Sequence, residues 1–210
     1  MNQHTSFAIG IPTLNRWDLL QPTLRRYVKD FPDTKIYVWD NGNQDTKEIY
    51  GVHCFIRSDR NRGVAASWNI LCDMIFKAGH SHAMILNDDV YLGTAEKDIQ
   101  QLIEKKPESF LCSMRDFCAF VLPATVAKKT GPFDAKFMAY HEDKDYKFRM
   151  KKAGISFIEE TLLNPKIFRD SSTLQKDPSI KQFYHDGLKY YIEKWGGEPG
   201  KEKFETPFNQ

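Results

Sequence analysis

The chain alternates short apolar runs, several of them rich in β-branched residues, with stretches whose apolar residues recur at helical spacing. The runs predict strands at Phe7–Ile11, Ile36–Trp39, Val52–Ile56, Ala83–Leu86, Phe110–Ser113 and Phe117–Leu122. The spaced patterns predict helices at Trp17–Lys29, from Gly63 to Ile75, around Ile99–Ile103, at His141–Ala153 and at Pro178–Trp195. This alternation predicts an α/β fold in which a mostly parallel central sheet carries helices on both faces.

Length and charge narrow the classes of protein that remain. With 210 residues, we expect one compact domain spanning residues 1–210, a size that also fits the first domain of a longer protein. The 30 basic and 28 acidic residues give a net charge of +2, which offers no electrostatic case for nucleic acid or an anionic membrane. No apolar run approaches the roughly 20 residues that span a bilayer.

The cysteines and the N-terminal residues indicate the cellular compartment in which the protein works. The four cysteines lack the close pairing of metal ligands, and three of them lie in apolar runs, so we interpret them as buried free thiols. The first residues show no charged-then-apolar signal pattern. Together these features predict a cytoplasmic protein.

Three polar clusters follow predicted strands, at Thr13–Arg16, Asp40–Asn43 and Asn87–Asp89. In a parallel α/β sheet, ligands bind beyond the carboxyl ends of the strands. We therefore expect the three clusters to form one site. Each of them alone is a weaker signal, because Asn, Asp and Gly are common in ordinary turns.

The cluster Asn87–Asp89 ends an apolar run with two adjacent carboxylates. Carboxylate oxygens are preferred ligands of hard divalent cations, so one interpretation is a metal site for a phosphate-bearing ligand. The other is an Asp-rich turn after a strand, and the motif alone does not decide between them.

Two further segments carry weaker signals. Asp40 could accept hydrogen bonds from a nucleobase or ribose, although the Asn41-Gly42 dipeptide is also a strong turn signal. Arg62 and Gly63 precede a helix, where a glycine permits close backbone approach and a helix N-terminus suits an anion. A plain helix entry is the alternative for this segment.

A second acidic cluster, His141–Asp145, lies about fifty residues beyond the first. Carboxylates at these spacings on a helix start cannot all face one way, so one can enter a cleft while the others pair with basic residues. A single carboxylate in a cleft suits a general base that deprotonates a hydroxyl. Ordinary helix-start acidity explains the cluster equally simply.

Taken together, the motifs resemble the GT-A glycosyltransferases, in particular the large inverting group called family 2. The resemblance covers most of the chain, in order and at similar spacing. It rests on Ile11–Arg16, Val38–Gly42, Asn61–Asn69, Asn87–Asp89, Gly131–Asp134 and Glu142–Arg149.

The resemblance implies a GT-A (Rossmann-like) nucleotide-diphospho-sugar transferase fold and a role for each matched position. Thr13, Asp40 and Arg62 would bind the nucleotide, with a uridine diphosphate as the first candidate, and Asn87 and Asp88 would lie against its ribose and sugar. Asp89 would bind Mn²⁺ or Mg²⁺. Asp143 would be the catalytic base, with Glu142 as its substitute. The implied partners are a nucleotide-diphospho-sugar donor and a glycan or glycoprotein acceptor.

Three positions depart from the pattern of that family. Asn87 replaces the first carboxylate of its D-x-D motif, and Trp68 stands where many members have Arg. A late His that many members use as a ligand is absent from Ile167–Asp170, where Arg169 or the more distant His185 would have to substitute. The polar stretch Phe168–Pro178 is our candidate for a loop that closes over the donor.

Other classes stay open at this stage. A nucleotidyltransferase also combines an α/β sheet with acidic metal ligands, but residues 10–13 lack the Gly-rich basic loop that holds a triphosphate. The departures at Asn87 and the late His favour a non-catalytic module that binds a sugar nucleotide or a glycan. No G-x-G-x-x-G follows a strand, which argues against a dinucleotide oxidoreductase.

Overall fold

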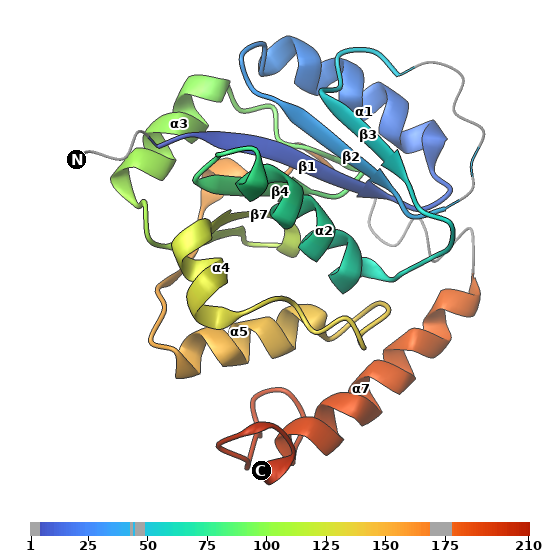
Figure 1. Ribbon diagram of the computed structural model, residues 1–210, viewed down its shortest axis with the longest axis vertical. Helices are drawn as coiled ribbons and strands as arrows, with labels where there is room; N and C mark the ends of the chain where they lie inside the picture. The colour runs from blue at the N-terminus through green and yellow to red at the C-terminus, as the bar shows by residue number, and fades with distance from the viewer. Residues whose placement is uncertain (1–4, 43, 45–48, 169–177) are drawn as a thin grey trace.

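The computed structural model describes residues 5–42, 44, 49–168 and 178–210. Seven strands form its central sheet in the order β3-β2-β1-β4-β7-β6-β8 (Figure 1). The strands are β1 (Phe7–Thr13), β2 (Ile36–Asp40), β3 (Cys54–Arg57), β4 (His82–Leu86), β6 (Phe110–Ser113), β7 (Asp116–Pro123) and β8 (Phe157–Glu159). Neighbouring strands are parallel except where β7 pairs with β4 and β6. The predicted mostly parallel sheet is confirmed.

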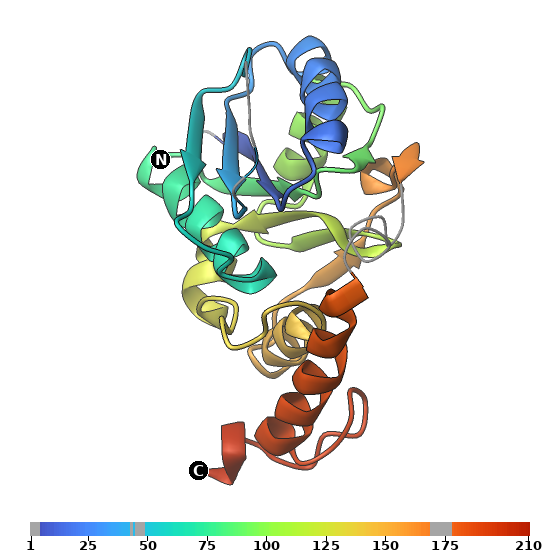
Figure 2. The same ribbon diagram turned by 90° about the vertical axis from the view of Figure 1, so that its right-hand side faces the viewer.

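Helices cover both faces of this sheet, which explains why its central strands are apolar along their whole length. The helices α1 (Trp17–Asp30) and α3 (Glu96–Lys105) pack on one face. The helices α2 (Val64–Lys77), α4 (Ala124–Thr130) and α5 (Glu142–Lys152) pack on the other, as the two views show (Figures 1 and 2). Every residue of β4 is buried between these layers.

The main elements lie within two residues of their predicted bounds, except that α3 begins three residues before Ile99 and the last helix begins three residues after Pro178. The chain forms a 3₁₀ turn, η2, at Pro178–Ile180, and α7 then runs from Lys181 to Trp195. Several short elements have no counterpart in the prediction: α4, β8, the small sheet of β5 (Val90–Tyr91) and β9 (Ile167–Phe168), and the 3₁₀ turns η1 (Thr161–Leu163) and η3 (Pro207–Asn209).

The helix α7 extends from the region of the sheet's edge to the far end of the molecule, where the C-terminus lies (Figures 1 and 2). Its residues Tyr191 and Trp195 are buried and form a small separate core with Phe137. The four cysteines are free thiols, three of them buried and Cys54 half-buried. Among the helices of the described ranges, none has the length and apolar character of a bilayer-spanning segment.

Candidate functional site

A cleft of about 440 Å³ lies at the carboxyl edge of the sheet. The strands β1, β2 and β4 end at this edge, and β7 begins there because it runs the opposite way. Six of the predicted site residues line this cleft, namely Thr13, Asn87, Asp88, Asp89, Glu142 and Asp143. Asp40 and Arg62 are not in the lining.

Asp88, the first of the two carboxylates after β4, is only 8% exposed. Its burial, reinforced by the neighbouring charge of Asp89, raises the pKa of Asp88 to about 7, although a hydrogen bond with Thr13 and the charge of Arg16 act in the opposite direction. The Arg16 guanidinium donates two 3.0 Å hydrogen bonds to Asp18. Among the described residues, no Lys or Arg forms an ion pair with the buried carboxyl group of Asp88.

A divalent cation suits this pair of carboxylates. The described residues contain no cluster of three or more His, Cys, Asp or Glu side chains that could hold a metal ion by themselves. Mg²⁺ sites in phosphate-transferring proteins commonly use one or two carboxylates, and substrate phosphates and water complete the coordination. Asp88 and Asp89 fit a site of that kind, in which the ligand brings the remaining oxygens.

Asp40 is fully buried and its carboxylate is already occupied by donors from the protein. It accepts hydrogen bonds from the Gly42 amide at 3.1 Å and from Gln44 Nε2 at 3.2 Å, and it pairs with Arg57 Nε at 2.9 Å. Gln44 also lies 3.4 Å from the Thr13 hydroxyl, which lines the cleft. A ligand would reach Asp40 only if Gln44 or Arg57 gave up its contact.

The segment Asn61–Gly63 is fastened to the edge of the sheet. Asn41 Nδ2 donates to Asn61 Oδ1, and Asn41 Oδ1 accepts from the Arg62 amide, both at 2.8 Å. Gly63 has a φ of 82°, and a Cβ there would lie 2.8 Å from the Met138 backbone. The side chain of Arg62 points to Ser58 and Asp59. The glycine thus allows this loop to close one wall of the cleft against Met138.

The acidic start of α5 follows two residues in the left-handed region. Tyr140 and His141 both have φ near 67°, a conformation that non-glycine residues rarely adopt outside functional or strained sites. The chain then places both Glu142 and Asp143 in the cleft lining. Burial, followed by the charge of Asp143, raises the pKa of Glu142 to about 8.

The two carboxyl groups differ in their surroundings. Asp143 Oδ2 lies 3.0 Å from the ammonium of Lys144, which also contacts Asp116 at 3.3 Å. Glu142 Oε2 is buried and has no hydrogen-bond partner within the described part of the chain. Of the two, Asp143 is the one that has a basic partner, whereas burial favours the neutral form of Glu142.

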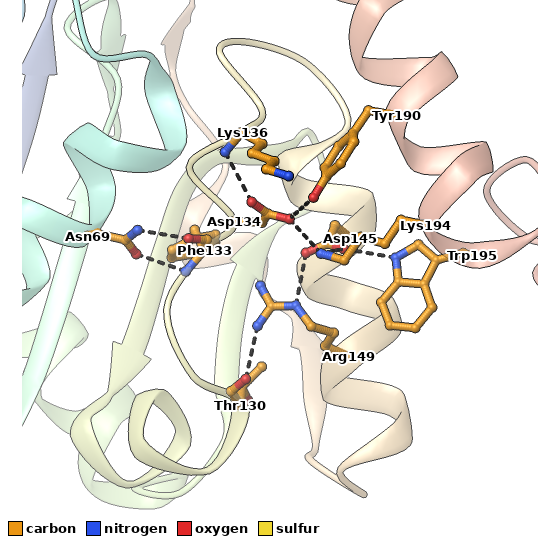
Figure 3. Close-up of polar contacts among 10 residues, drawn as sticks. All are labelled: Asn69, Thr130, Phe133, Asp134, Lys136, Asp145, Arg149, Tyr190, Lys194 and Trp195. Carbon is orange, nitrogen blue, oxygen red and sulfur yellow. Dashed lines mark hydrogen bonds and ion pairs between the residues drawn. The ribbon is translucent and has the colours of Figure 1, made fainter. Parts of the chain in front are cut away.

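Asp134 and Asp145 are absent from the cleft lining and bind residues of α7 instead (Figure 3). Asp134 accepts from Tyr190 and Lys194, at 2.8 and 2.7 Å. Asp145 accepts from Lys194, Trp195 and Arg149, at 2.7 to 2.9 Å. We call these six residues the α7 network. The expectation that only part of the acidic cluster enters a cleft agrees with this arrangement.

Several lining residues were not among the predicted site residues. Arg115 and Asp116 come from the turn between β6 and β7, and Ile180 and Phe183 come from the start of α7. Trp68 also lines the cleft and packs against Phe117, Phe120 and Phe133. Arg115 is the basic side chain of the lining, whereas Arg62, the predicted one, lies outside it.

The loop that we expect to close over the donor, Phe168–Pro178, lies outside the described residues except for its two end positions. The same holds for Arg169. His185 is an exposed residue of α7 and is absent from the cleft lining.

Comparisons with known proteins identify similar folds but no matching family. No protein-family model matches the chain, and no curated protein matches it. A solved structure of the mannosyltransferase PcManGT from Pyrobaculum calidifontis, in complex with GDP-Man and Mn²⁺, is similar with a TM-score of 0.65. It is 11% identical in sequence, and the match covers 95% of this chain and 67% of that one.

A second solved structure, a putative nucleotide-diphospho-sugar transferase from Desulfovibrio desulfuricans G20, gives a TM-score of 0.51 at 6% identity. That match covers 74% of this chain and 80% of the other. At such low identities the likeness concerns the fold alone. The chain has the fold of nucleotide-diphospho-sugar transferases, as the sequence motifs predicted.

Proposed function

We propose that this protein is an inverting, metal-dependent glycosyltransferase. It would move a hexose or deoxyhexose, such as glucose, mannose or rhamnose, from a nucleotide-diphospho-sugar to a hydroxyl of a glycan or a protein-linked saccharide. The observation that carries the proposal is the meeting of two acidic pairs, Asp88–Asp89 and Glu142–Asp143, in one cleft at the carboxyl edge of this fold. One pair suits a metal-bound diphosphate and the other suits an attacking hydroxyl.

The donor would bind on the sheet side of the cleft. Thr13 and Asp40 would contact the nucleoside, for which uridine is the first candidate, and Asn87 and Asp88 would lie against the ribose and the sugar. Because Asp40 is paired with Arg57 and Gln44, nucleoside binding would exchange one of these contacts for a contact to the base. Arg62 lies at the edge of the site, where its side chain would have to leave Asp59 to reach a phosphate.

Asp89 would hold Mn²⁺ or Mg²⁺, with Asp88 beside it and diphosphate oxygens as further ligands. When bound, the cation would offset the negative charge that builds on the departing diphosphate. The raised pKa of Asp88 supports this role, because a cation removes the penalty that burial imposes on its charged form.

Asp143 would accept the proton of the acceptor hydroxyl while the oxygen attacks the anomeric carbon. Attack from the face opposite the diphosphate inverts the configuration at that carbon. Lys144, whose ammonium lies 3.0 Å from Asp143 Oδ2, would orient the carboxylate. Glu142, with its raised pKa and buried position, suits a hydrogen-bond donor to a bound sugar better than a base.

Turnover tests this proposal. The protein is incubated with UDP-, GDP- and dTDP-sugars, Mn²⁺ and methyl pyranosides, and nucleotide release and the anomeric proton coupling of the product are followed by NMR. We expect release that depends on metal, a product of inverted configuration, and loss of transfer by roughly 100-fold or more in Asp143→Asn. Full activity of Asp143→Asn would remove the assigned base, and a retained configuration would remove the inverting mechanism.

A non-catalytic module that binds sugar nucleotides or glycans is the second candidate. The replacement at Asn87 and the internal pairing of Asp40 favour it, because both reduce the groups that are free to engage a donor. Binding of a nucleotide sugar without any release of nucleotide in the same assay would support this candidate over the enzyme. A nucleotidyltransferase would instead release diphosphate from a nucleoside triphosphate.

A further inference from the structure

The wall of the cleft opposite the sheet comes from a different part of the chain. Met138 and Tyr140 precede α5, while Ile180 and Phe183 belong to η2 and the first turn of α7. All four line the cleft beside Glu142 and Asp143. This wall is apolar and aromatic, whereas the sheet side carries Thr13, Asn87 and the two aspartates.

An exposed aromatic side chain continues the wall outward. Tyr184 is 45% exposed, although it packs edge-on against the ring of Tyr140 at 5.6 Å and lies 4.8 Å from the ring of His141. A large aromatic ring that is fixed by its neighbours and still open to solvent is a common form of recognition surface, since it offers contact area at little entropic cost.

The backbone under this wall is strained and closely packed. Tyr140 and His141 are consecutive residues with φ near 67°. Gly187, in the middle of α7, is buried, and a Cβ there would lie 3.0 Å from the Tyr140 carbonyl oxygen and 3.2 Å from the His141 ring. A glycine inside a helix is less favourable than an alanine. Here it allows α7 to hold the unusual turn that presents Tyr140 next to Asp143.

We propose that Tyr140, Phe183 and Tyr184 form a binding surface for the pyranose ring of an uncharged saccharide, the acceptor of the proposed transfer. That the saccharide is the acceptor rests on the proposed function, whereas the binding of a saccharide to this surface does not. The C–H face of a pyranose packs on aromatic rings, and its hydroxyls reach the neighbouring carboxylates. A ring bound here has a hydroxyl within the part of the cleft that contains Asp143.

The charges of the cleft select against an acidic saccharide. Among the described residues, five carboxyl residues line it, namely Asp88, Asp89, Asp116, Glu142 and Asp143, together with one guanidinium, that of Arg115. Lys144 pairs with Asp143 and Asp116 and so offsets part of this charge. A uronate or a phosphorylated sugar would still meet an excess of acidic groups, whereas a neutral ring would carry no charge for them to repel.

Ligand-observed NMR tests the surface directly. Methyl glycosides of glucose, mannose, galactose and glucuronic acid are titrated with the wild-type protein, with and without UDP and Mn²⁺, and with Phe183→Ala, Tyr184→Ala and Tyr184→Phe. The matched control is Tyr50→Ala, which removes another exposed tyrosine, 72% exposed, that is absent from the cleft lining. Binding of UDP with Mn²⁺ is measured on every variant.

We expect neutral glycosides to bind and glucuronate to bind more weakly. The two alanine variants should lose about tenfold in glycoside affinity, while Tyr184→Phe and Tyr50→Ala keep it and all variants keep UDP affinity. Failure of every neutral glycoside to bind the wild-type protein, or an equal loss of UDP affinity in the alanine variants, would overturn the inference. Glycoside binding without any nucleotide binding would support the surface and count against the proposed function.

Discussion

Two groups of buried carboxyl residues in this protein have opposite surroundings. In the α7 network, Asp145 is fully buried and accepts from Lys194, Arg149 and Trp195 (Figure 3). In the cleft, Asp88 and Glu142 are nearly as buried, but no Lys or Arg of the described ranges forms an ion pair with either of them.

The pKa values report the same contrast. The hydrogen bonds and the charge of Lys194 outweigh burial at Asp134 and lower the pKa of that carboxyl, whereas burial dominates at Asp88 and Glu142 and raises theirs. A buried carboxylate that the protein neutralises is part of the architecture. One that the protein leaves uncompensated costs stability, and such groups concentrate at functional sites.

The same substitution made in both groups tests most strongly whether their surroundings differ. Asp145→Asn should lower the free energy of unfolding by about 3 kcal/mol, because it leaves Arg149 and Lys194 without a buried counter-charge. Asp88→Asn should leave stability unchanged or raise it, because it removes a charge that burial disfavours. Urea denaturation of the two variants measures both values, and similar losses in both would mean that the two groups do not differ.

The pH dependence of stability sharpens the comparison at Glu142. Its pKa is raised to about 8 in the folded protein, so the unfolded chain releases this proton at lower pH than the folded one. The stability that the neutral group gives is full below the unfolded pKa and is lost as pH rises toward 8. Compared with Glu142→Gln, the wild-type protein should be equally stable near pH 4 and less stable by up to about 5 kcal/mol above pH 8. Parallel stability curves for the two proteins would contradict this assignment.

A smaller effect is expected at Lys144, which links the cleft to the neighbouring surface. Lys144→Met removes the ammonium 3.0 Å from Asp143 Oδ2, so the carboxylate loses the partner that orients it and the transfer rate should fall about threefold. Lys147→Met is the matched control, because Lys147 contacts Asp116 at 2.9 Å and belongs to the same helix. Equal transfer rates for the two variants would mean that Lys144 has no particular role in supporting Asp143.

The sequence predicted the sheet and the meeting of Thr13 with Asn87–Asp89 at one edge of it, because both depend on short-range patterns. Apolar runs set the strands, and polar residues directly after β1 and β4 had to meet at one edge once the strands were parallel. The antiparallel direction of β7 could not be predicted in this way, because it depends on the turn around Arg115 and Asp116. The same turn also brings these two residues into the cleft.

The partners of individual side chains could not be predicted in this way. Asp40 was expected to face a nucleoside, but its donors include Arg57 from the neighbouring strand β3, which no local pattern reveals. The same limit applies to Asp145, which is indistinguishable from Asp143 in the motif and is bound instead by Lys194, 49 positions away in the printed sequence. The close approach of Gly187 to Tyr140 likewise appears only once α7 is folded against α5.

Our account proposes that Asp88 and Asp89 in the cleft bind a divalent cation together with a nucleotide. Its most direct test is the thermal and chemical stability of the wild-type protein and Asp89→Asn, each with UDP or GDP and either Mn²⁺ or EDTA. Asp73→Asn serves as the control, because Asp73 forms an exposed surface pair with Lys77. The account predicts that nucleotide at about 100 times its dissociation constant stabilises the wild-type and control proteins by roughly 2.7 kcal/mol with Mn²⁺, and that EDTA or Asp89→Asn abolishes the effect. Equal stabilisation of Asp89→Asn, or stabilisation that survives EDTA, would contradict it.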